Sequence, residues 1–441
     1  MIVNTKLMPI EQAPKSWIDL AKPEFKGKFI MANPAQSGSA FSQLHQIVGL
    51  HGWDVMDKII NNAVFVSSSK LAFQNIAKGE SPIGLTSEFN VVQSKEEGFP
   101  VAAVDHCLEA FAHGKHVVNV TVEADAFCGP LLARHAQQAG VVYSMAFGDQ
   151  PALICDLVDW ARTCGFPVVA AGRGHKWLPH FCESTPETVW GYYGLTPEQA
   201  ARGGLNPKMF NSFLDGSKPA IESTAVANAT GLAVPQDGLR YPPGSIADIP
   251  NLTRPASVGG VLEKKGMVEV ISSLRPDGTP IDYDIRMGVW VTVEADTDYI
   301  KHCFEEYNAH TDDSGRYFTL YKRWHLIGLE VGQSVASVAL RREPTGVAQG
   351  WHADVVATAK RDLRPGDVLD GEGGATVWGK LQPASRSMAL GGLPLGLAHD
   401  VKVLHPVAKG QCLTWADVAM DTTTRAWQIR REMESAFKPA A

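Results

Sequence analysis

The sequence predicts an α/β protein of several domains, built around an incomplete parallel sheet of the doubly wound kind. Short apolar strands alternate with helical patterns over residues 1–170, and a later stretch alternates polar and apolar residues around a Pro-Asp-Gly turn. The chain has 441 residues, 45% of them hydrophobic, which suffices for more than one core. We expect four domains, over residues 1–104, 105–170, 171–340 and 341–441.

The charge and cysteine content favour a cytoplasmic protein with a small-molecule partner. The net charge is −7 and basic residues are scattered among acidic ones, so we expect neither nucleic acid nor a membrane as the partner. No apolar run reaches the roughly 20 residues of a membrane helix, and MIVNTKLMPIEQAPKSW does not resemble a signal peptide. The 7 cysteines form no CxxC pair, so we expect reduced thiols.

The first segment, residues 1–104, has the pattern of an α/β unit. KGKFIMA is expected to be a strand, SAFSQLHQIVGLHGWDVMDKIINNA one helix and VFVSS the next strand, and SKLAFQNIAKGE, PIGLTSEF and FPVAAV continue the alternation. Ser37, Gly38 and Ser39 lie where strand passes to helix. They either bind an anion through hydroxyls and backbone amides or only cap the helix, and the sequence leaves both open.

This first segment resembles one lobe of the iron-type periplasmic solute-binding proteins of ABC importers. The resemblance rests on PKSWIDLAKPEFKGKFIMANPAQSGSA and SSSKLAFQNIAKGESPIGLTSEF. It implies ligand contacts at Ser37, Ser39 and Ser68. Such proteins enclose a ligand between two lobes, so one lobe predicts at most weak anion or solute binding and no transport.

The second segment, residues 105–170, has a βαβ rhythm. DHCLEAFAHGK and AFCGPLLARHAQQAG are expected helices, and HVVNVTV and VVYSMAF are expected buried strands. A dinucleotide-binding domain opens with a strand, a GxGxxG loop and a helix, and no such loop precedes this unit. Gly172 and Gly174 come too late and lack the third glycine, so we expect a tight turn there.

Several segments after Asp105 carry a dense resemblance to one family: GKHVVNVTVEADAFCGPLLA, FGDQPALICDLVDWA, AAGRGHKWLPHF, NPKMFNSFLDGSKPAIESTAVANATGL, SGRYFTLYKRWHLIGLE and DLRPGDVLDGEGGATVWGKL. They resemble the deoxyxylulose-phosphate reductoisomerase-like (DRL) proteins, homoserine-dehydrogenase-like oxidoreductases that end in a SAF domain. The resemblance implies a Rossmann-type domain, truncated here, then an α+β catalytic domain and a small β-rich SAF domain. The family's opening strand, glycine loop, first helix and ribose-binding strand have no counterpart, and the solute-binding-like lobe stands in their place.

The same resemblance implies a function and a cofactor. It implies NADP-dependent reduction of a small phosphorylated, sugar-derived carbonyl compound, and some members of the family make methylerythritol phosphate for isoprenoids. The missing glycine loop argues against a complete NADP site. A homo-oligomer is expected by default for such an enzyme.

Acidic residues follow the strand HVVNVTV at its carboxyl end, where open α/β sheets bind ligands. Glu123 and Asp125 either contact a ligand there or complement the dipole of the next helix. With Asn119 they are the expected cofactor-binding residues. Two carboxylates without a third ligand do not predict a metal site, so none is assigned.

A loop with functional side chains is expected directly after the next apolar strand, in AGRGHKWLPHF. His175, Lys176 and His180 lie there. A phosphorylated substrate needs a cation for its phosphate and a proton donor for its carbonyl oxygen. Lys176 suits both roles and is a catalytic candidate, with a solvated surface lysine as the alternative, and His180 is expected to bind substrate.

A polar stretch from Asn206 to Asn228 is expected to be largely helical after Ser217. Its polar residues recur at spacings of three or four, so in one continuous helix they share a face. A solvated face has the same pattern, but the apolar and small residues around it indicate burial, which perturbs pKa values. We expect Lys218 to be the proton donor or transition-state cation, oriented by Asp215. Lys208 joins these as catalytic, and Asn206, Asn211 and Glu222 are expected to bind substrate.

Residues 258–331 alternate in strand fashion around the Pro-Asp-Gly turn and predict an antiparallel sheet that walls the substrate site. The resemblance suggests substrate binding by Arg286, Arg316, Tyr321 and His325. Two functions therefore compete. One is an NAD(P)H-dependent oxidoreductase, and the other is a catalytically silent fusion that at most binds a small anion or solute.

Overall fold

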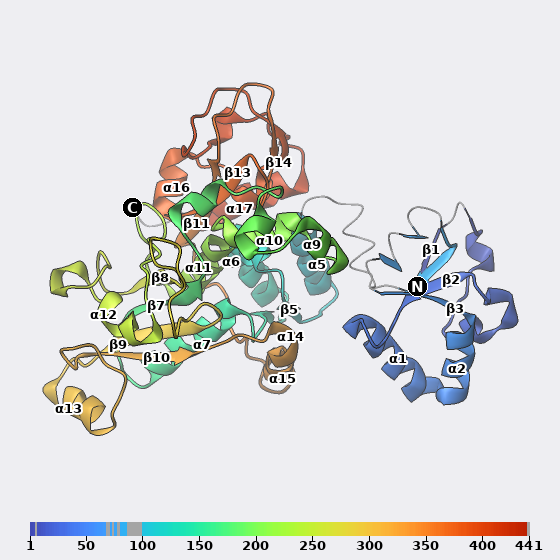
Figure 1. The fold of residues 1–441 in the computed structure, drawn as a ribbon, viewed down its shortest axis with the longest axis horizontal. Helices are drawn as coiled ribbons and strands as arrows, with labels where there is room; N and C mark the ends of the chain where they lie inside the picture. The colour runs from blue at the N-terminus through green and yellow to red at the C-terminus, as the bar shows by residue number, and fades with distance from the viewer. Residues whose placement is uncertain (5–6, 68–70, 73–74, 77–79, 86–98, 439–441) are drawn as a thin grey trace. The chain divides into compact units, whose positions relative to one another are not determined.

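The computed structural model describes residues 1–4, 7–67, 71–72, 75–76, 80–85 and 99–438 of the chain (Figure 1). These residues form two compact units, Met1–Ala102 and Ala103–Ala441. The finer division at residues 170 and 340 stays a prediction. Within the described ranges, no helix combines the length and the apolar character that crossing a membrane requires.

The first unit contains a four-stranded sheet in the order β1-β4-β2-β3. Its strands are β1 (Ile2–Val3), β2 (Phe29–Ala32), β3 (Ala63–Val66) and β4 (Ile83–Leu85). The strands β3 and β4 pair parallel to β2, and β1 pairs antiparallel to β4. The strands predicted at KGKFIMA and VFVSS and the α/β class are confirmed, whereas FPVAAV does not continue the alternation but opens the next helix.

The long helix predicted in this unit is wrong in one respect, because it is two helices. These are α1 (Gly38–His51) and α2 (Trp53–Asn62). Gly52 between them has φ 79°, a left-handed conformation that favours glycine and ends α1. The helices bury Ile47, Met56 and Ile59 in the core of the unit with Phe29 of the sheet.

The second unit begins with the βαβ segment that the sequence predicts. It comprises α5 (Phe99–Ala112), β5 (Val117–Asn119), α6 (Val122–Gln138), β6 (Tyr143–Met145) and α7 (Gln150–Thr163). The strands β5 and β6 pair in parallel, and the sheet has these two strands only among the described residues. The helix α5 begins earlier than expected, at Phe99. Inside α6 the backbone leaves helical geometry at Cys128, two residues before Pro130.

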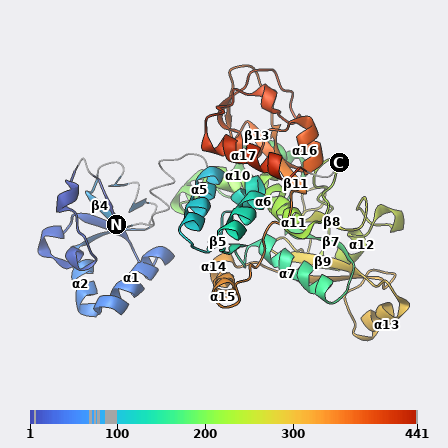
Figure 2. The same ribbon diagram turned by 180° about the vertical axis from the view of Figure 1, so that it is seen from behind.

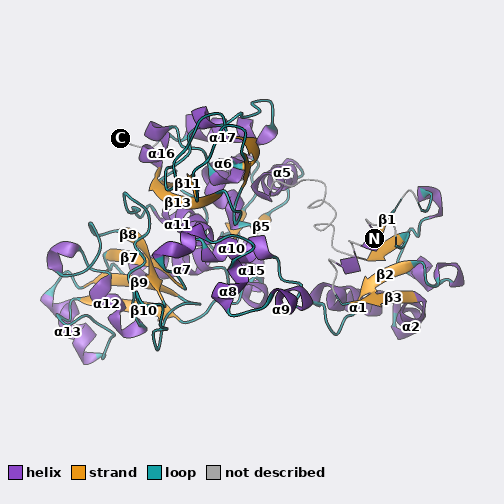
Figure 3. Ribbon diagram, turned by 45° about the horizontal axis from the view of Figure 1, so that its top comes forward, coloured by secondary structure: helices purple, strands orange, loops and turns teal. Residues whose placement is uncertain are grey.

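A second sheet has the order β10-β9-β7-β8 (Figure 3). Its strands are β7 (Val168–His175), β8 (Met267–Ser272), β9 (Val289–Glu294) and β10 (Tyr317–Lys322). The strand β8 is parallel to β7, whereas β9 is antiparallel to both β7 and β10. The predicted antiparallel sheet therefore holds for β9 and β10 but not for β8. The Pro-Asp-Gly turn itself closes a short antiparallel bridge between Leu274 and Pro280.

The remaining helices of this part are α8 (Val189–Tyr193), α9 (Pro197–Arg202), α10 (Pro207–Leu214), α11 (Ser217–Thr230), α12 (Ile249–Leu252), α13 (Asp298–Glu306), α14 (Ile327–Glu330) and α15 (Gly332–Ala336). The C-terminal part pairs β11 (Ala353–Ala359) with β13 (Val377–Pro383) and β12 (Val368–Asp370) with β14 (His399–Lys402), and adds α16 (Ala384–Leu390) and α17 (Arg425–Ala436). The helix α11 is central, since it packs against α6, α7, α10, β11 and β13 (Figure 2).

The glycines of the β7 segment are in the strand and do not form the predicted tight turn. A Cβ on Gly172 would lie 1.8 Å from the carbonyl oxygen of Glu269, and a Cβ on Gly174 would lie 2.0 Å from that of Ile285. Neither glycine has a positive φ. They are needed because neighbouring backbone approaches β7 too closely for any side chain.

We expect Gly172→Ala to prevent stable folding of the second unit, because the Glu269 backbone and the Trp290 ring would both have to move. The matched control is Gly191→Ala in α8, where nothing lies within 4 Å of the added Cβ and alanine favours the helix. Soluble yield and thermal unfolding followed by circular dichroism measure both. Parent-like unfolding of Gly172→Ala would contradict the close approach.

Candidate functional site

A buried group of charges surrounds the first turn of α11. Lys218 there forms an ion pair with Glu123, in the first turn of α6, and the two side chains are 17% and 14% exposed. Asp149, at the start of α7, and Glu372, in the C-terminal part, add negative charge. Burial alone lowers the pKa of Lys218, but Glu123, Asp149 and Glu372 together raise it above its usual 10.5. We call these four residues the Lys218 cluster.

Helix starts supply two of its carboxylates. Asp149 caps α7 and accepts a hydrogen bond of 2.9 Å from the backbone amide of Gln150, and Glu123 occupies the first turn of α6. Negative charge is favourable at both positions because of the helix dipole. Burial raises the pKa of Asp149, while the nearby Lys218 lowers it. The ammonium in the first turn of α11 therefore depends on these carboxylates for stabilisation.

Glu372 comes from the glycine-rich loop between β12 and β13. Gly373 of that loop has φ 67°, and a Cβ there would lie 2.0 Å from the carbonyl oxygen of Lys208 in α10. Asn211 donates hydrogen bonds to the carbonyl groups of Gly373 (2.9 Å) and Gly374 (3.3 Å), which fix the loop on α10. Burial raises the pKa of Glu372 to about 8, with Glu123 adding to the shift and Lys218 opposing it.

The helix predicted after Ser217 is confirmed as α11, but the condition that residues 211–222 form one continuous helix is not met, because the chain breaks at Gly216 with φ 92°. Asp215 lies in that break, fully buried, and accepts hydrogen bonds from Lys360 Nζ (2.7 Å) and the Ser217 amide (2.8 Å). Asp215 therefore anchors Lys360 and the start of α11, and does not orient Lys218 as predicted.

Further charges lie beside the cluster. Arg173 of β7 forms a buried ion pair with Glu222 of α11, and burial lowers the pKa of Arg173 to about 10 although Asp149 opposes the shift. His325 Nδ1 donates a hydrogen bond of 2.7 Å to the Met287 carbonyl oxygen, and burial is the main cause of the lowered pKa of His325. The charges of Arg173 and Asp149 also act on His325. Glu222 and His325, both predicted, thus join the site.

Two predicted cations, Lys176 and Arg286, lie close enough to each other to interact. Lys176 donates a hydrogen bond of 2.7 Å to the Tyr192 carbonyl group, and its ammonium lies 5.6 Å from the ring centre of Tyr193. Burial lowers the pKa of Lys176, and the charge of Arg286 lowers it further. Arg286 also acts on His175, whose pKa is well below its usual value because of burial. The imidazole of His175 is therefore neutral, with Nε2 2.5 Å from the Phe213 carbonyl oxygen.

Other predicted residues have structural partners. Asn206 caps α10 through hydrogen bonds from the amides of Lys208 (3.0 Å) and Met209 (3.2 Å). Asn211 also binds Ser184, and Arg316 binds the Ala295 carbonyl group at 2.8 Å. Three candidates remain. Lys208 is half-buried on α10, His180 is exposed and packs against Phe181 and Tyr192, and Tyr321 is 39% exposed beside His310.

The expected cofactor residues Asn119 and Asp125 bind each other. Asn119 Nδ2 and the Tyr143 hydroxyl each donate to the Asp125 carboxylate at 2.8 Å, and all three side chains are buried. Burial raises the pKa of Asp125 from 3.8 to about 7, against the effect of these two hydrogen bonds. This network holds β5, β6 and α6 together. Of the three residues expected to bind the cofactor, Asn119, Glu123 and Asp125, only Glu123 belongs to the Lys218 cluster.

The raised pKa of Asp125 predicts how the stability of the second unit depends on pH. Between 3.8 and about 7 the folded carboxyl holds a proton that the unfolded chain has released, so the free energy of unfolding falls as pH rises through this window. The slope is at most about 1.4 kcal/mol per pH unit. Asp125→Asn removes this contribution. In urea denaturation, the free energy of unfolding of the variant minus that of the parent should therefore increase as pH rises from about 4 to about 7. A difference that is constant with pH would contradict the buried, protonated carboxyl.

In the first unit, the serine candidates gather at one helix start. Ser37 is the half-buried N-cap residue of α1, and Ser39 lies in its first turn. Ser68 lies outside the described residues. Both interpretations of this segment, capping and anion binding, stay open.

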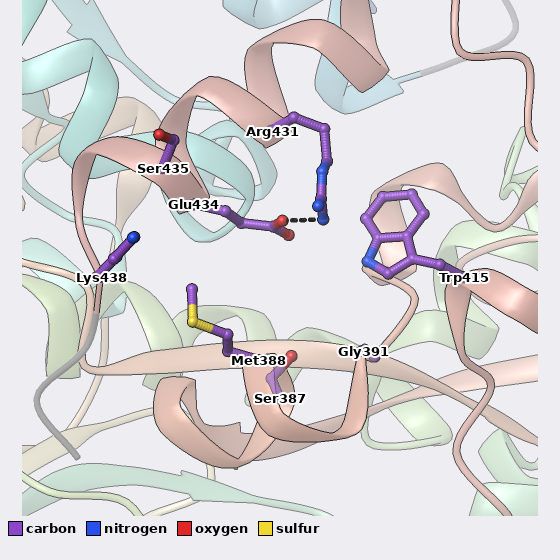
Figure 4. A pocket seen from close by; sticks show the side chains of 9 residues that line it. Ser387, Met388, Gly391, Trp415, Arg431, Glu434, Ser435 and Lys438 are labelled. Carbon is purple, nitrogen blue, oxygen red and sulfur yellow. Dashed lines mark hydrogen bonds and ion pairs between the residues drawn. The ribbon is translucent and has the colours of Figure 1, made fainter.

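A separate pocket of about 400 Å³ lies in the C-terminal part, between α16 and α17 (Figure 4). Trp415 and Met388 form an apolar wall, and Arg431, paired with Glu434, faces them. None of the predicted residues lines this pocket. Among the described residues, no three His, Cys, Asp or Glu side chains are arranged to hold a metal ion.

Sequence reasoning missed several residues at the site. Asp149 and Gln150 belong to the sequence DQP at the start of α7, where an acidic N-cap residue comes shortly before a proline. This signal marks a helix start and could have placed both residues just after β6. The glycines around Glu372 indicate that another backbone segment approaches this loop closely, but the sequence does not show which helix or strand that segment belongs to. Arg173 carries no local signal, since it lies inside an apolar strand.

Gln150 has a further property. Its side chain is fully buried, and neither its amide nitrogen nor its oxygen has a hydrogen-bond partner among the described residues. Such a group costs about 1–3 kcal/mol to bury unpaired, so it needs a ligand or water. It follows Asp149 of the Lys218 cluster directly.

Comparison with known proteins identifies both parts of the chain. Residues 148–331 match the family model of the oxidoreductase DRL catalytic domain, and residues 1–104 match that of the bacterial extracellular solute-binding proteins. The resemblance to solute-binding proteins is thereby confirmed for residues 1–104 and the resemblance to the DRL proteins for residues 148–331, while the SAF domain stays a prediction. An oxidoreductase domain and a solute-binding domain each bind small molecules, which confirms the expected class of ligand.

Two relatives are similar over shorter stretches. An uncharacterized protein of Haemophilus influenzae is 30% identical over 113 residues, which are 24% of this chain and 33% of the relative. The crystal structure of iron-bound HitA from Pseudomonas aeruginosa is 20% identical, with a TM-score of 0.20, over 22% of this chain and 32% of that one. The chain thus covers about a third of each relative's length.

Proposed function

We propose, from the match of residues 148–331 to an oxidoreductase catalytic domain, that the unit from Ala103 is an NAD(P)H-dependent oxidoreductase that reduces a small, phosphorylated, sugar-derived carbonyl compound. The observation that carries this proposal is Lys218, a mostly buried ammonium that pairs with Glu123 and lies near the acidic side chains of Asp149 and Glu372. A fixed cation in a poorly solvated site stabilises the negative charge that develops on a carbonyl oxygen during reduction.

The phosphorylated substrate follows from the second pair of cations. The positive charge of Arg286 lowers the pKa of Lys176, because the two cations repel each other. An anion bound between them would relieve this repulsion. The charge of Asp149 in the Lys218 cluster acts on Arg173, and the charges of Arg173 and Arg286 act on His175, so these residues link the two groups electrostatically. A short molecule with phosphate at one end and carbonyl at the other suits this arrangement. Deoxyxylulose phosphate, the substrate that the family resemblance suggests for isoprenoid synthesis, is the first compound to test.

The nicotinamide end of a dinucleotide fits the residues present. Its carboxamide has one donor and one acceptor, which complement the unpaired amide of Gln150, and its oxidised ring is cationic, which suits Glu123 and Asp149. When bound, the cofactor supplies a hydride. Its pyrophosphate has no comparable fit at the starts of α6 and α7, because both carry acidic residues where a phosphate would bind.

Titration of the purified chain with NADPH, followed by fluorescence, tests the proposal. Saturable micromolar binding that weakens in Gln150→Leu supports it, and NADH in parallel shows which coenzyme is preferred. Absence of binding at millimolar coenzyme overturns it and favours the alternative, a catalytically silent fusion with the fold of the enzyme. A cytoplasmic location and a homo-oligomer stay predictions.

A further inference from the structure

We propose that the pocket between α16 and α17 binds a small aromatic carboxylate, with its ring against Trp415 and Met388 and its carboxylate at Arg431 (Figure 4). This inference goes beyond the proposed function, because no residue of the Lys218 cluster lines the pocket. The pocket volume of about 400 Å³ falls within the range of small-molecule sites, about 300–1,000 Å³.

The two helices that form the pocket are fixed by one buried carboxylate. Asp354 of β11 accepts hydrogen bonds from the Ser387 hydroxyl of α16 (2.6 Å) and from Arg430 Nη2 of α17 (2.5 Å). The Asp354 and Arg430 side chains are 2% and 1% exposed. Because this network holds α16 and α17 in place, a ligand enters a preformed pocket and the protein loses little conformational freedom on binding.

The apolar wall of the pocket is also held by the backbone. The amide of Trp415 donates a hydrogen bond of 2.9 Å to the Gly391 carbonyl group. Gly391 has a left-handed φ of 65° and no side chain to occupy the pocket. The Trp415 indole and the Met388 thioether face the pocket (Figure 4). Both groups pack favourably against aromatic rings, so a flat ring suits this wall.

The basic side chains of the pocket have unused hydrogen-bond donors. Arg431 donates to Glu434 through Nη1, whereas its Nε and Nη2 have no partner among the described residues. The Arg431 guanidinium lies 5.6 Å from the ring centre of Trp415, so the basic and aromatic walls meet. A guanidinium with two free donors beside an aromatic wall is suited to bind the carboxylate of an aromatic acid.

The balance of charges favours a ligand with one negative charge. Glu434 lines the pocket, but its two oxygens already accept from Arg430 Nε (2.9 Å) and from Arg431. Arg430 also pairs with Asp354, and Lys438 at the edge of the pocket has no ion-pair partner in the described part of the chain. Three cations therefore face two carboxylates, and an anionic ligand would compensate the remaining positive charge.

Isothermal titration calorimetry of the full chain with naphthalene-2-carboxylate tests the inference. Naphthalene-2-carboxamide has the same ring without the charge, and acetate has the charge without the ring. We expect saturable binding of the carboxylate with a Kd of about 10 μM to 1 mM, and affinities at least about 10-fold weaker for the other two compounds. Equal affinity for the carboxylate and either comparison compound, or no binding of the carboxylate, would overturn the inference.

Arg431→Met removes the guanidinium from an exposed position of α17. We expect the affinity for naphthalene-2-carboxylate to fall about 10-fold and the affinity for the carboxamide to stay within about 2-fold of the parent. The matched control is Arg425→Met, which changes an exposed arginine of the same helix that does not line the pocket. If both variants lose the same affinity, Arg431 does not bind the carboxylate and the inference is wrong.

A second measurement locates the ligand. In protein labelled with carbon-13 at its methionine methyl groups, we expect the Met388 signal, assigned with Met388→Leu, to shift when naphthalene-2-carboxylate is added. The signal of Met209, an exposed methionine of α10, should stay in place. An unchanged Met388 signal at saturating ligand would overturn the inference whatever calorimetry shows. Neither result bears on the proposed function, because the two sites share no residue.

Discussion

Replacing Lys360 by methionine is expected to lower the free energy of unfolding of the second unit by about 3–5 kcal/mol. The Lys360 and Asp215 side chains are 2% and 0% exposed, and Lys360 Nζ also donates to the carbonyl groups of Ser184 (2.7 Å) and Gly374. The substitution leaves the Asp215 charge buried without its cation and frees the loop that carries Glu372. Urea denaturation of parent and variant measures the difference.

The neighbouring residue supplies the matched control. Arg361 pairs with Asp367 at the surface, with side chains 51% and 28% exposed, so Arg361→Ala should cost at most about 1 kcal/mol. Adding Asp215→Asn to Lys360→Met should restore part of the lost stability, because the unpaired charge is gone. Equal losses for Lys360→Met and Arg361→Ala would contradict a buried ion pair at the break between α10 and α11.

Lys218→Met is expected to lower kcat by about 10²–10³-fold, because the transition-state oxyanion loses its fixed cation. It should also change the pH dependence of stability. Without the ammonium, the pKa values of the neighbouring carboxyls rise further, and a raised carboxyl pKa makes the folded state less stable as pH increases. The variant should therefore lose more stability at pH 8 than at pH 6, which urea denaturation at the two values measures.

Lys265→Met serves as the control for this substitution. Lys265 is half exposed and pairs with Glu294 on the sheet, away from the Lys218 cluster. We expect its kcat and its stability at both pH values to match the parent within the range typical of surface substitutions, about 0.5 kcal/mol. If Lys265→Met and Lys218→Met behave alike, the cluster has no special electrostatic role.

The order of strands and helices could be predicted from the sequence because apolar periodicity is local. The βαβ segment before α7 and the strand and helix signals of the first unit follow from that periodicity. The errors arose where one residue interrupts a pattern. Gly52 and Gly216 each adopt a left-handed conformation that ends a helix, and each lies within a run whose apolar spacing continues.

The site was only partly predictable, for a related reason. Lys218, Glu222 and Lys176 could be found because they lie in polar segments with the family resemblance, and Glu123 because it follows a strand. The partner of Asp215 could not be found, since Lys360 is 145 residues away in sequence and pairing at such separation leaves no local pattern. Glu372 was missed for the same reason, because its loop meets α10 only in the folded chain.

The central claim is that the Lys218 cluster is the catalytic site of an oxidoreductase. Oxidation of NADPH by the parent chain and by Lys218→Met, followed by the near-ultraviolet absorbance of the coenzyme with deoxyxylulose phosphate and related phosphorylated hydroxycarbonyls, tests it most directly. We expect substrate-dependent oxidation of NADPH by the parent chain and none by Lys218→Met. Oxidation at equal rates in both proteins, or none in a parent that unfolds cooperatively, would contradict it.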